Sequence, residues 1–407
     1  MTDPNPRVSP RRAAVAFIFV TVVLDMLALG IVAPVLPKLI ESFLAGDTAR
    51  AAAVYGLFGT VWALMQFLGS PALGVLADRY GRRPIIILSN LGLGLDYVLM
   101  ALAPTLAWLF VGRVISGIMA ASIATAGAYI ADVTPPERRS AGFGMLSAAF
   151  GLGFVLGPAL GGVLGTVDPR LPFWAAAGLS LLNTLYGVLV LPESLPAGRR
   201  SGLSWRRANP LGSLALLRSH PALLALAAVT LINGVAHESR YAFVLYTSYR
   251  YGWDARAVGL ALAAVGIGSI VVGGGLVRPL VRRFGERRAL LAGLAFGAAG
   301  FAIFGVAGTG AVFCIGIAVQ ALWGLYNPAV QGLMTRWVGP TEQGQLQGAL
   351  GSVRGIAFMI GPGLFTLTFA HFIGAGSDWH APGAPFLLAA LLLAVAMVLA
   401  ARATRPR

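Results

Sequence analysis

The sequence predicts an all-α membrane protein with twelve transmembrane helices in two pseudo-symmetric six-helix bundles. Of the 407 residues, 57% are hydrophobic and only 11% are charged, which is too little polar surface for a water-soluble chain of this length. The apolar residues gather in runs of about 20, the length of helix that crosses a hydrocarbon core roughly 30 Å thick. These runs form two sets of six.

Each run is expected to be helical, because lipid cannot satisfy the hydrogen bonds of free backbone groups. The 53 glycines would weaken helices in water, but in a membrane they let neighbouring helices approach closely. The predicted spans are 13–36, 51–73, 84–104, 105–130, 141–166, 171–191, 221–247, 255–277, 289–308, 311–334, 346–372 and 383–402.

Arginine and lysine are distributed unequally between the two sides. One set of loops and termini carries 22 of them, and the opposite set carries only Lys38, Arg50, Arg170, Arg250 and Arg256. Because positive residues are retained on the cytoplasmic side, we expect both termini in the cytoplasm and a multi-pass protein of the cell inner membrane. The net charge of +15 therefore needs no nucleic-acid partner.

A polar, arginine-rich stretch separates six runs from six. We predict an N-terminal bundle over 1–191, a cytoplasmic linker over 192–220 and a C-terminal bundle over 221–407. The halves match at a constant offset of 204 residues, which predicts a repeat about an axis along the membrane normal with the substrate site between the halves. The matching positions include Tyr80-Gly81 with Phe284-Gly285, Pro136 with Pro340, Gly144 with Gly348, and Gly157-Pro158 with Gly361-Pro362.

Asp25 lies about 12 residues into the first span, roughly 18 Å deep and near the midplane. A charge there costs at least about 2.5–3.5 kcal/mol on insertion scales, a cost met by protonation or by a partner. Arg113 lies at a similar depth in the fourth span and stays charged. We expect Asp25 and Arg113 to couple transport to protons, with Asp25 ionised beside Arg113 in one state and protonated in another. A static ion pair is the alternative.

Polar residues in the second half form another candidate group. Asn233, His237 and Arg240 recur at spacings of four and three residues, so they are expected on one helix face. Glu238 lies beside them, and Arg354 lies roughly 12 Å into the eleventh span. Buried charges in membrane spans are functional candidates, so we assign these residues to the substrate path. His237 would add a second group that titrates near neutral pH.

Several motifs resemble those of the major facilitator superfamily over essentially the whole chain, which implies that fold. They are the loop Gly74–Pro84, the segment Leu109–Gly117 with Arg113, and the glycine-rich run Gly153–Gly162, which is similar to that of exporters. Leu24-Asp25 followed by Pro34–Pro37 is similar to the first span of drug–proton antiporters. The segments Asp96–Ala101, Ala128–Asp132 and Gly344–Gly348 are similar to the tetracycline efflux family.

The tetracycline resemblance implies that Asp96, near the midplane of the third span, lines the drug path and attracts cationic groups. A hydrogen-bonded helix contact is the alternative for this residue. The second half departs from the pattern, because Gly297 replaces an aspartate and Ser269 replaces a histidine. We therefore expect a substrate pocket of changed chemistry.

The loop between the second and third spans is short and charged. Its glycines permit a tight turn, and Asp78 at a helix end can accept backbone hydrogen bonds from a facing helix N-terminus. The resemblance implies a latch that stabilises the outward-open state; membrane topology alone is the alternative for the arginines. The expected latch residues are Gly74, Asp78, Arg79, Gly81, Arg82, Arg83 and Asp132, with Glu137 and Arg138 near the last.

The fifth span carries the exporter-like motif. Gly153, Gly157 and Gly161 recur every four residues, so they share a face that permits close helix approach. Pro158 removes a hydrogen bond and can bend the helix beside Gly162. The resemblance implies a hinge or a seal against proton leak, and plain packing is the alternative.

Together these patterns predict a proton-coupled antiporter that exports a small drug-like molecule of the tetracycline type. A proton-coupled transporter of another metabolite or drug on the same fold is the alternative. Lys38 is the only lysine and is not in a phosphate-binding loop, so we expect no nucleotide hydrolysis and no enzyme. One cysteine and four histidines without ligand spacing favour neither metal nor cofactor. The expected partners are a small molecule, protons and lipid, and one chain is expected to suffice.

Overall fold

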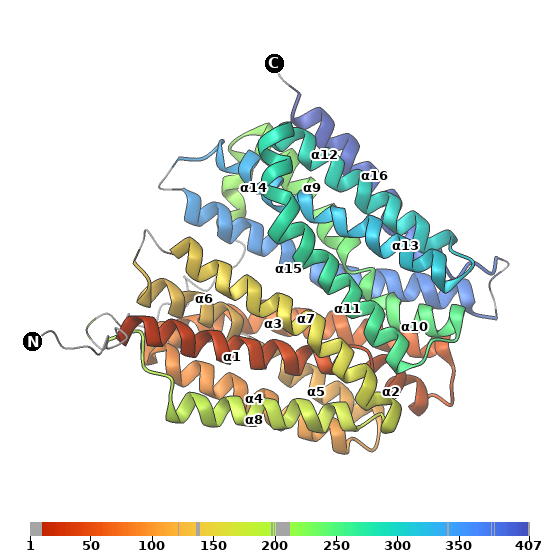
Figure 1. The fold of residues 1–407 in the computed structure, drawn as a ribbon, viewed down its shortest axis with the longest axis horizontal. Coiled ribbons are helices and arrows are strands. Elements are labelled where there is room, and N and C mark those ends of the chain that lie inside the picture. Colours follow the sequence, from red (N-terminus) through yellow and green to blue (C-terminus); the bar gives the residue numbers. More distant parts are fainter. Residues whose placement is uncertain are drawn as a thin grey trace, which may run out of the picture.

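The fold is built from helices, and no strand occurs among the residues that the structure describes (Figure 1). The structure, a computed structural model, describes residues 10–120, 122–135, 139–196, 198, 200, 212–339, 342–375, 377 and 379–405. The first-half helices are α1 Pro10–Val32, α2 Leu36–Phe43, α3 Thr48–Tyr80, α4 Arg82–Leu102, α5 Leu106–Met119, α6 Ser122–Val133, α7 Arg139–Val167 and α8 Leu171–Leu189. The second-half helices are η4 Gly212–Arg218, α9 Pro221–His237, α10 Arg240–Tyr251, α11 Ala255–Val271, η5 Val272–Leu276, α12 Val277–Val306, α13 Gly310–Ala321, η6 Leu322–Leu325, α14 Tyr326–Thr335, α15 Gln343–Ile373 and α16 Ala384–Ala403.

The described residues contain 11 helical segments long and apolar enough to cross a membrane, one fewer than predicted. The difference lies at Ala255–Val306, a continuous segment of 52 residues that contains two of the predicted spans. At 1.5 Å per residue it is roughly 78 Å long, more than twice the thickness of a hydrocarbon core. Gly285, with φ of +80°, interrupts this segment between the two predicted spans.

Short polar side chains fix where several helices begin. The carboxylates of Asp47 and Asp254 accept hydrogen bonds from backbone N–H groups in the first turns of α3 and α11, and the hydroxyl of Thr309 does the same for α13. Each contact satisfies a donor that the helix leaves free. At its other end α3 stops at Gly81, whose φ of +112° favours glycine. Gly81 and Gly285 have matching positive φ, as expected from the repeat.

Two helix pairs form the most extensive contacts between the halves. In Figure 1, α7 runs beside α11, and α3 packs on α15. The offset of 204 residues relates α7 to α15 and α3 to the segment that contains α11. The two contacts are therefore exchanged by the repeat, as a pseudo-two-fold axis between the halves requires. Part of the predicted linker, residues 201–211, lies outside the described residues.

Candidate substrate cavity

A cavity of about 800 Å³ lies between the two halves. The first half lines it with α1 to α5 and α7, and the second half with α9 to α13, η5, η6 and α16. Its volume is typical of sites for drug-sized ligands. The walls include many aromatic side chains, among them Trp62, Phe150, Phe154, Phe243, Phe301, Phe304, Trp323 and Phe386.

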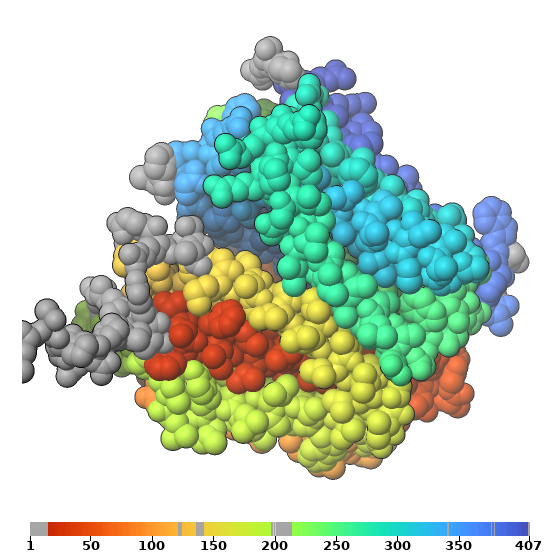
Figure 2. All heavy atoms as spheres, in the orientation of Figure 1, coloured from red at the N-terminus to blue at the C-terminus, as the bar shows by residue number. Residues whose placement is uncertain are grey.

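The cavity is closed at one end by tight helix contacts. A methyl group on Gly162 of α7 would lie 3.0 Å from the Cα atom of Gly259 in α11, and Figure 2 shows these helices in contact. We call the other end, where the Gly81 turn meets Glu193, the linker end. Toward it, methyl groups on the lining residues Gly144 and Gly274 would meet nothing within 4 Å. The cavity therefore opens toward the linker end.

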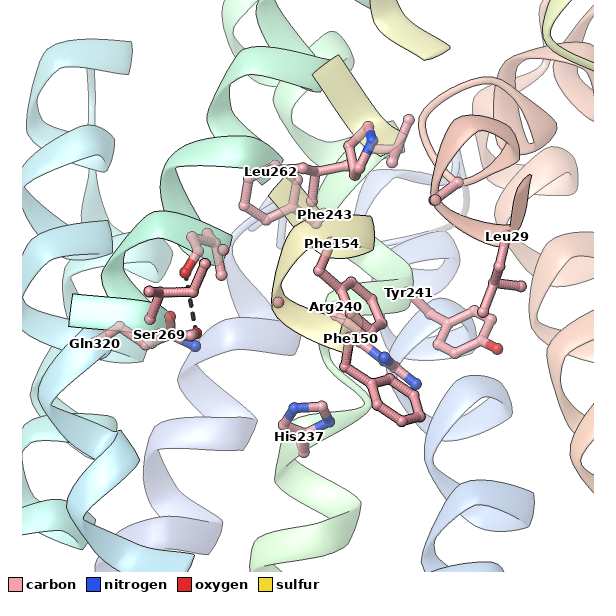
Figure 3. Close-up of a pocket in the computed structure, with 18 of the residues that line it drawn as sticks. Leu29, Phe150, Phe154, His237, Arg240, Tyr241, Phe243, Leu262, Ser269 and Gln320 are labelled. Carbon is pink, nitrogen blue, oxygen red and sulfur yellow. Dashed lines mark hydrogen bonds between the residues drawn. The ribbon is translucent and has the colours of Figure 1, made fainter. Parts of the chain in front are cut away.

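A break between α9 and α10 supplies the main polar group of the second half. The break contains Glu238, whose side chain is only 1% exposed. Its carboxylate lies 3.3 Å from His237 Nδ1 and accepts a hydrogen bond of 3.3 Å from a terminal nitrogen of Arg240. His237 and Arg240 both line the cavity (Figure 3). Interrupted helices at membrane depth are typical of transporter binding sites.

Glu238 is accommodated by a glycine on a neighbouring helix. A methyl group on Gly361 of α15 would lie 2.6 Å from Glu238 Cγ, so a larger residue would displace the carboxylate. Asn233, predicted on the same face as His237, instead accepts a hydrogen bond of 2.8 Å from Trp323 Nε1. The Trp323 and His237 rings lie 5.5 Å apart between centroids. Asn233 thus positions a lining residue without lining the cavity itself.

Two tyrosines meet where the halves adjoin. Tyr55 of α3 and Tyr241 of α10 have ring centroids 5.2 Å apart, and both line the cavity. Arg113 of α5 also lines the cavity and lies within electrostatic reach of both tyrosines. A terminal nitrogen of Arg113 contacts Met100 Sδ at 3.6 Å. Cations from both halves therefore face the same space.

The predicted proton-coupling residues are both buried in the first half. Asp25 on α1 is 7% exposed and Arg113 is 9% exposed. Tyr97 of α4, a lining residue, lies within electrostatic reach of both. The structure thus places Asp25 and Arg113 in one region, around Tyr97.

Four other sequence candidates differ in their relation to the cavity. Asp96 is buried against α5, where a methyl group on Gly112 would lie 2.7 Å from its Oδ1 atom, and it does not line the cavity. Arg354 is half-buried on α15 and also lies off the lining. Gly297 packs against η6, whereas Ser269 lines the cavity. Roles for Asp96 and Arg354 in the substrate path stay predictions.

The glycine motif of α7 packs on two helices. Gly153, Gly157 and Gly161 all face α1; for example, a methyl group on Gly157 would lie 2.6 Å from the Cα atom of Gly30. Gly162 faces α11 instead, and Pro158 lines the cavity. The close approach predicted for the shared face is present. The motif thus connects the helix that carries Asp25 to the contact between the halves.

The predicted latch residues form a network within the first half at the linker end. Arg82 pairs with Asp78 at 2.6 Å and with Asp132 at 3.2 Å. The backbone N–H of Arg82 donates to Glu193 Oε1 at 2.9 Å. Arg83 donates to the carbonyls of residues 187 and 188 at the end of α8. These contacts join the ends of four helices, α3, α4, α6 and α8, to the start of the linker.

The other latch candidates contribute less to this network. The Arg79 guanidinium lies 5.3 Å from the ring centre of Tyr80, and a methyl group on Gly74 would meet nothing within 4 Å. Glu137 and Arg138, expected near Asp132, lie outside the described residues. Among the described residues Asp78 forms no ion pair with the second half.

Several residues of the site were not singled out by the sequence patterns. Tyr55, Tyr241 and Trp323 line the cavity, and Glu193 completes the linker-end network. Tyr241 and Glu193 could have been found from the sequence, because Tyr241 follows the candidate Arg240 and Glu193 lies in the predicted linker. Tyr55 and Trp323 could not, since aromatic residues are common in apolar helices.

Comparisons with known proteins agree with this architecture. The family model described as Major Facilitator Superfamily matches residues 18–278 and 239–407. The chain is 37% identical over 385 residues to the class C tetracycline resistance protein of Escherichia coli, covering 94% of this chain and 95% of that protein. It is 34% identical over 372 residues to the class G protein of Vibrio anguillarum, covering 90% and 93%.

Two solved structures share the fold. One is the human organic anion transporter MFSD10, with a TM-score of 0.71, 24% identity, and coverage of 96% of this chain and 99% of that one. The other is a bacterial homologue of the human lysosomal transporter Spinster in an inward-facing conformation, with a TM-score of 0.76, 18% identity and 97% coverage of both. Because the family model and the relatives both span most of its length, the chain belongs to the major facilitator superfamily.

Proposed function

We propose that this chain is a proton-coupled antiporter that exports a small drug-like molecule of the tetracycline type across the cell inner membrane. The observation that carries the proposal is a cavity formed by both halves, with buried Asp25 and Arg113 beside it. Relatives named as tetracycline resistance proteins support the class of cargo. One chain supplies every wall of the cavity, so we propose a monomer as the working unit.

In this proposal the linker end and both termini face the cytoplasm. Arginines concentrate in the loops assigned to that end, as positive residues do on the cytoplasmic side. The cavity opens toward the same end. The structure then corresponds to an inward-open state that is ready to receive cargo from the cell.

The proposed cycle exchanges cargo for a proton. Cargo binds from the cytoplasm while Asp25 is ionised, and the halves then rock so that the cavity opens outside. Asp25 takes up a proton there, because burial favours its neutral form once Arg113 no longer compensates its charge. Protonation displaces the cargo and permits the return, while the linker-end network around Arg82 stabilises the outward-open state.

A second candidate is export of a different metabolite or drug by the same cycle. It is favoured by the group Glu238, His237 and Arg240 at the cavity, together with Ser269 and Gly297 at positions where the tetracycline family carries titratable residues. The mechanism of proton coupling would be unchanged. A panel of drugs tested for growth protection distinguishes the two candidates.

The variant Asp25→Asn tests the coupling. It keeps the side-chain size but cannot ionise, so we expect insertion into the membrane with no proton release when drug is added to energised everted vesicles. The matched control is Asp168→Asn, an exposed residue in the turn before α8, which should transport normally. Full proton-coupled export by Asp25→Asn would defeat the proposal.

A further inference from the structure

The permanent charges that face the cavity are positive. Arg113 and Arg240 line it together with the imidazole of His237, and no aspartate or glutamate does so among the described residues. The nearest carboxyls of the first half, Asp25 and Asp96, are buried away from the lining. A ligand in the cavity therefore meets guanidinium groups and no carboxylate, which favours an anion.

Glu238 lowers the net positive charge beside Arg240 but does not contact cargo. Its carboxylate is enclosed by His237, Arg240 and α15, so it holds the two side chains in place and offers no surface to a ligand. The His237 and Arg240 side chains are still 49% and 40% exposed. Their outer nitrogens therefore remain available to a second acceptor. A guanidinium binds a carboxylate or phenolate through parallel hydrogen bonds.

The rest of the lining suits a flat apolar body. Phe150 and Phe154 come from the first half, and Phe243, Phe301 and Trp323 come from the second. Figure 3 shows Phe150, Phe154 and Tyr241 with Arg240 among the lining residues. An aromatic ring can stack on such walls. The guanidinium of Arg240 beside them then fixes the orientation of the ring, because a charged substituent on the ring must point toward it.

We propose that the cargo is an aromatic organic anion whose negatively charged oxygen binds Arg240 and His237, with Glu238 as the buried residue that positions both. The inference rests on the proposed function and specifies the cargo class of the same cavity. It assigns the recognition of charge to the second half, and leaves Asp25 and Arg113 in the first half to handle the proton.

The test compares two probes of one shape on the full-length protein in detergent. Equilibrium dialysis measures the binding of naphthalene-2-carboxylate and of naphthalene-2-carboxamide without a proton gradient. The acid should bind roughly 10- to 100-fold more tightly, the effect of one or two charge-assisted hydrogen bonds. Arg240→Gln should remove most of this difference and leave the amide unchanged. The control Arg250→Gln, at an exposed position off the lining, should keep it.

Arg240→Gln leaves the buried Glu238 carboxylate without its main partner. If this single variant does not fold, the double variant Arg240→Gln with Glu238→Gln, which removes both charges, takes its place in the test. Equal binding of acid and amide by the unmodified protein overturns the inference, and so does an unchanged preference in a folded Arg240 variant. The proposed function has a separate readout, which is proton release on adding tetracycline to vesicles. Loss of that release with intact acid preference counts against the function alone.

Discussion

Glu286 and Arg336 form an ion pair of 2.7 Å that repeats the pair of Arg82 with Asp132, 204 residues earlier, with the charges exchanged. Asp78, which also pairs with Arg82, corresponds to Arg282 at the same offset. The same pair of positions at the linker end therefore accommodates the acidic and basic residues in either order. Each half requires only that the two paired residues carry opposite charges. The Coulomb energy depends on the product of the two charges, which is unchanged when both signs are reversed.

Exchanging the charges of the first half tests this relationship. Asp132→Arg alone places two arginines against each other, and we expect export to fall by about 5- to 150-fold, the effect of 1–3 kcal/mol on a conformational equilibrium. The triple variant Asp78→Arg, Arg82→Glu and Asp132→Arg copies the second half and should recover most of the loss. Drug uptake into everted vesicles measures both. A triple variant as impaired as the single one would show that polarity itself matters.

The contact between α7 and α11 is a candidate for control of the conformational equilibrium. A methyl group on Gly162 would lie 2.5 Å from the Ala255 carbonyl oxygen, and overpacking of this kind costs about 1–3 kcal/mol. Gly162→Ala should therefore shift the population away from the closed arrangement at this end. Spin labels at Thr166 and Arg256, both exposed, in a Cys314→Ser background should report a longer distance.

The control for this prediction is Gly178→Ala on α8, where an added methyl group meets nothing within 4 Å. It should leave the label distance unchanged. An unchanged label distance in Gly162→Ala as well would mean that α7 and α11 accommodate the methyl group without a shift of the conformational equilibrium.

The sequence predicted the features that depend on local spacing. The glycines of α7 repeat every four residues, so their shared face followed directly, and the structure confirms it against α1. Gly162 belongs to the same motif but faces α11, and one chain segment gives no sign of which neighbour each face meets. The α9–α10 break at Glu238 was also missed, because the apolar run continues through it.

Contacts between the halves could not be predicted from spacing. Tyr55 and Tyr241 meet across the cavity, yet neither lies in a pattern that distinguishes it from a membrane-facing tyrosine. Asp96 was expected in the drug path from the tetracycline resemblance, but its depth near the midplane does not determine its direction around the helix, and the residue faces α5 in this conformation. Radial position depends on the packing of neighbouring helices.

Removing one partner of the hydrogen bond between Trp323 and Asn233 should destabilise the protein more than removing both. Trp323→Phe leaves the largely buried Asn233 amide without its 2.8 Å donor, which we expect to lower the free energy of unfolding by about 1–3 kcal/mol. The double variant Trp323→Phe with Asn233→Leu removes both partners and should be much less destabilised. Thermal unfolding in detergent measures each variant. Equal losses in the single and double variants would show that the bond contributes little.

The two turn glycines offer a matched pair for the linker end. Gly81 and Gly285 both have positive φ with ψ of 160°, so alanine at either position should cost about 1–3 kcal/mol in backbone strain. Only at Gly81 would the new methyl group also approach Glu193, at 2.7 Å from its Cδ atom, whereas at Gly285 it meets nothing within 4 Å.

Glu193 Oε1 accepts hydrogen bonds from the backbone N–H groups of Arg82, Ser194 and Leu195, and displacing it forfeits these bonds. Gly81→Ala should therefore lose about a further 1–3 kcal/mol relative to Gly285→Ala and release the start of the linker. Thermal unfolding of the two variants in one detergent gives the difference, and trypsin cleavage within 192–220 should be faster only in Gly81→Ala. Indistinguishable variants would mean that Glu193 does not anchor the linker to the first half.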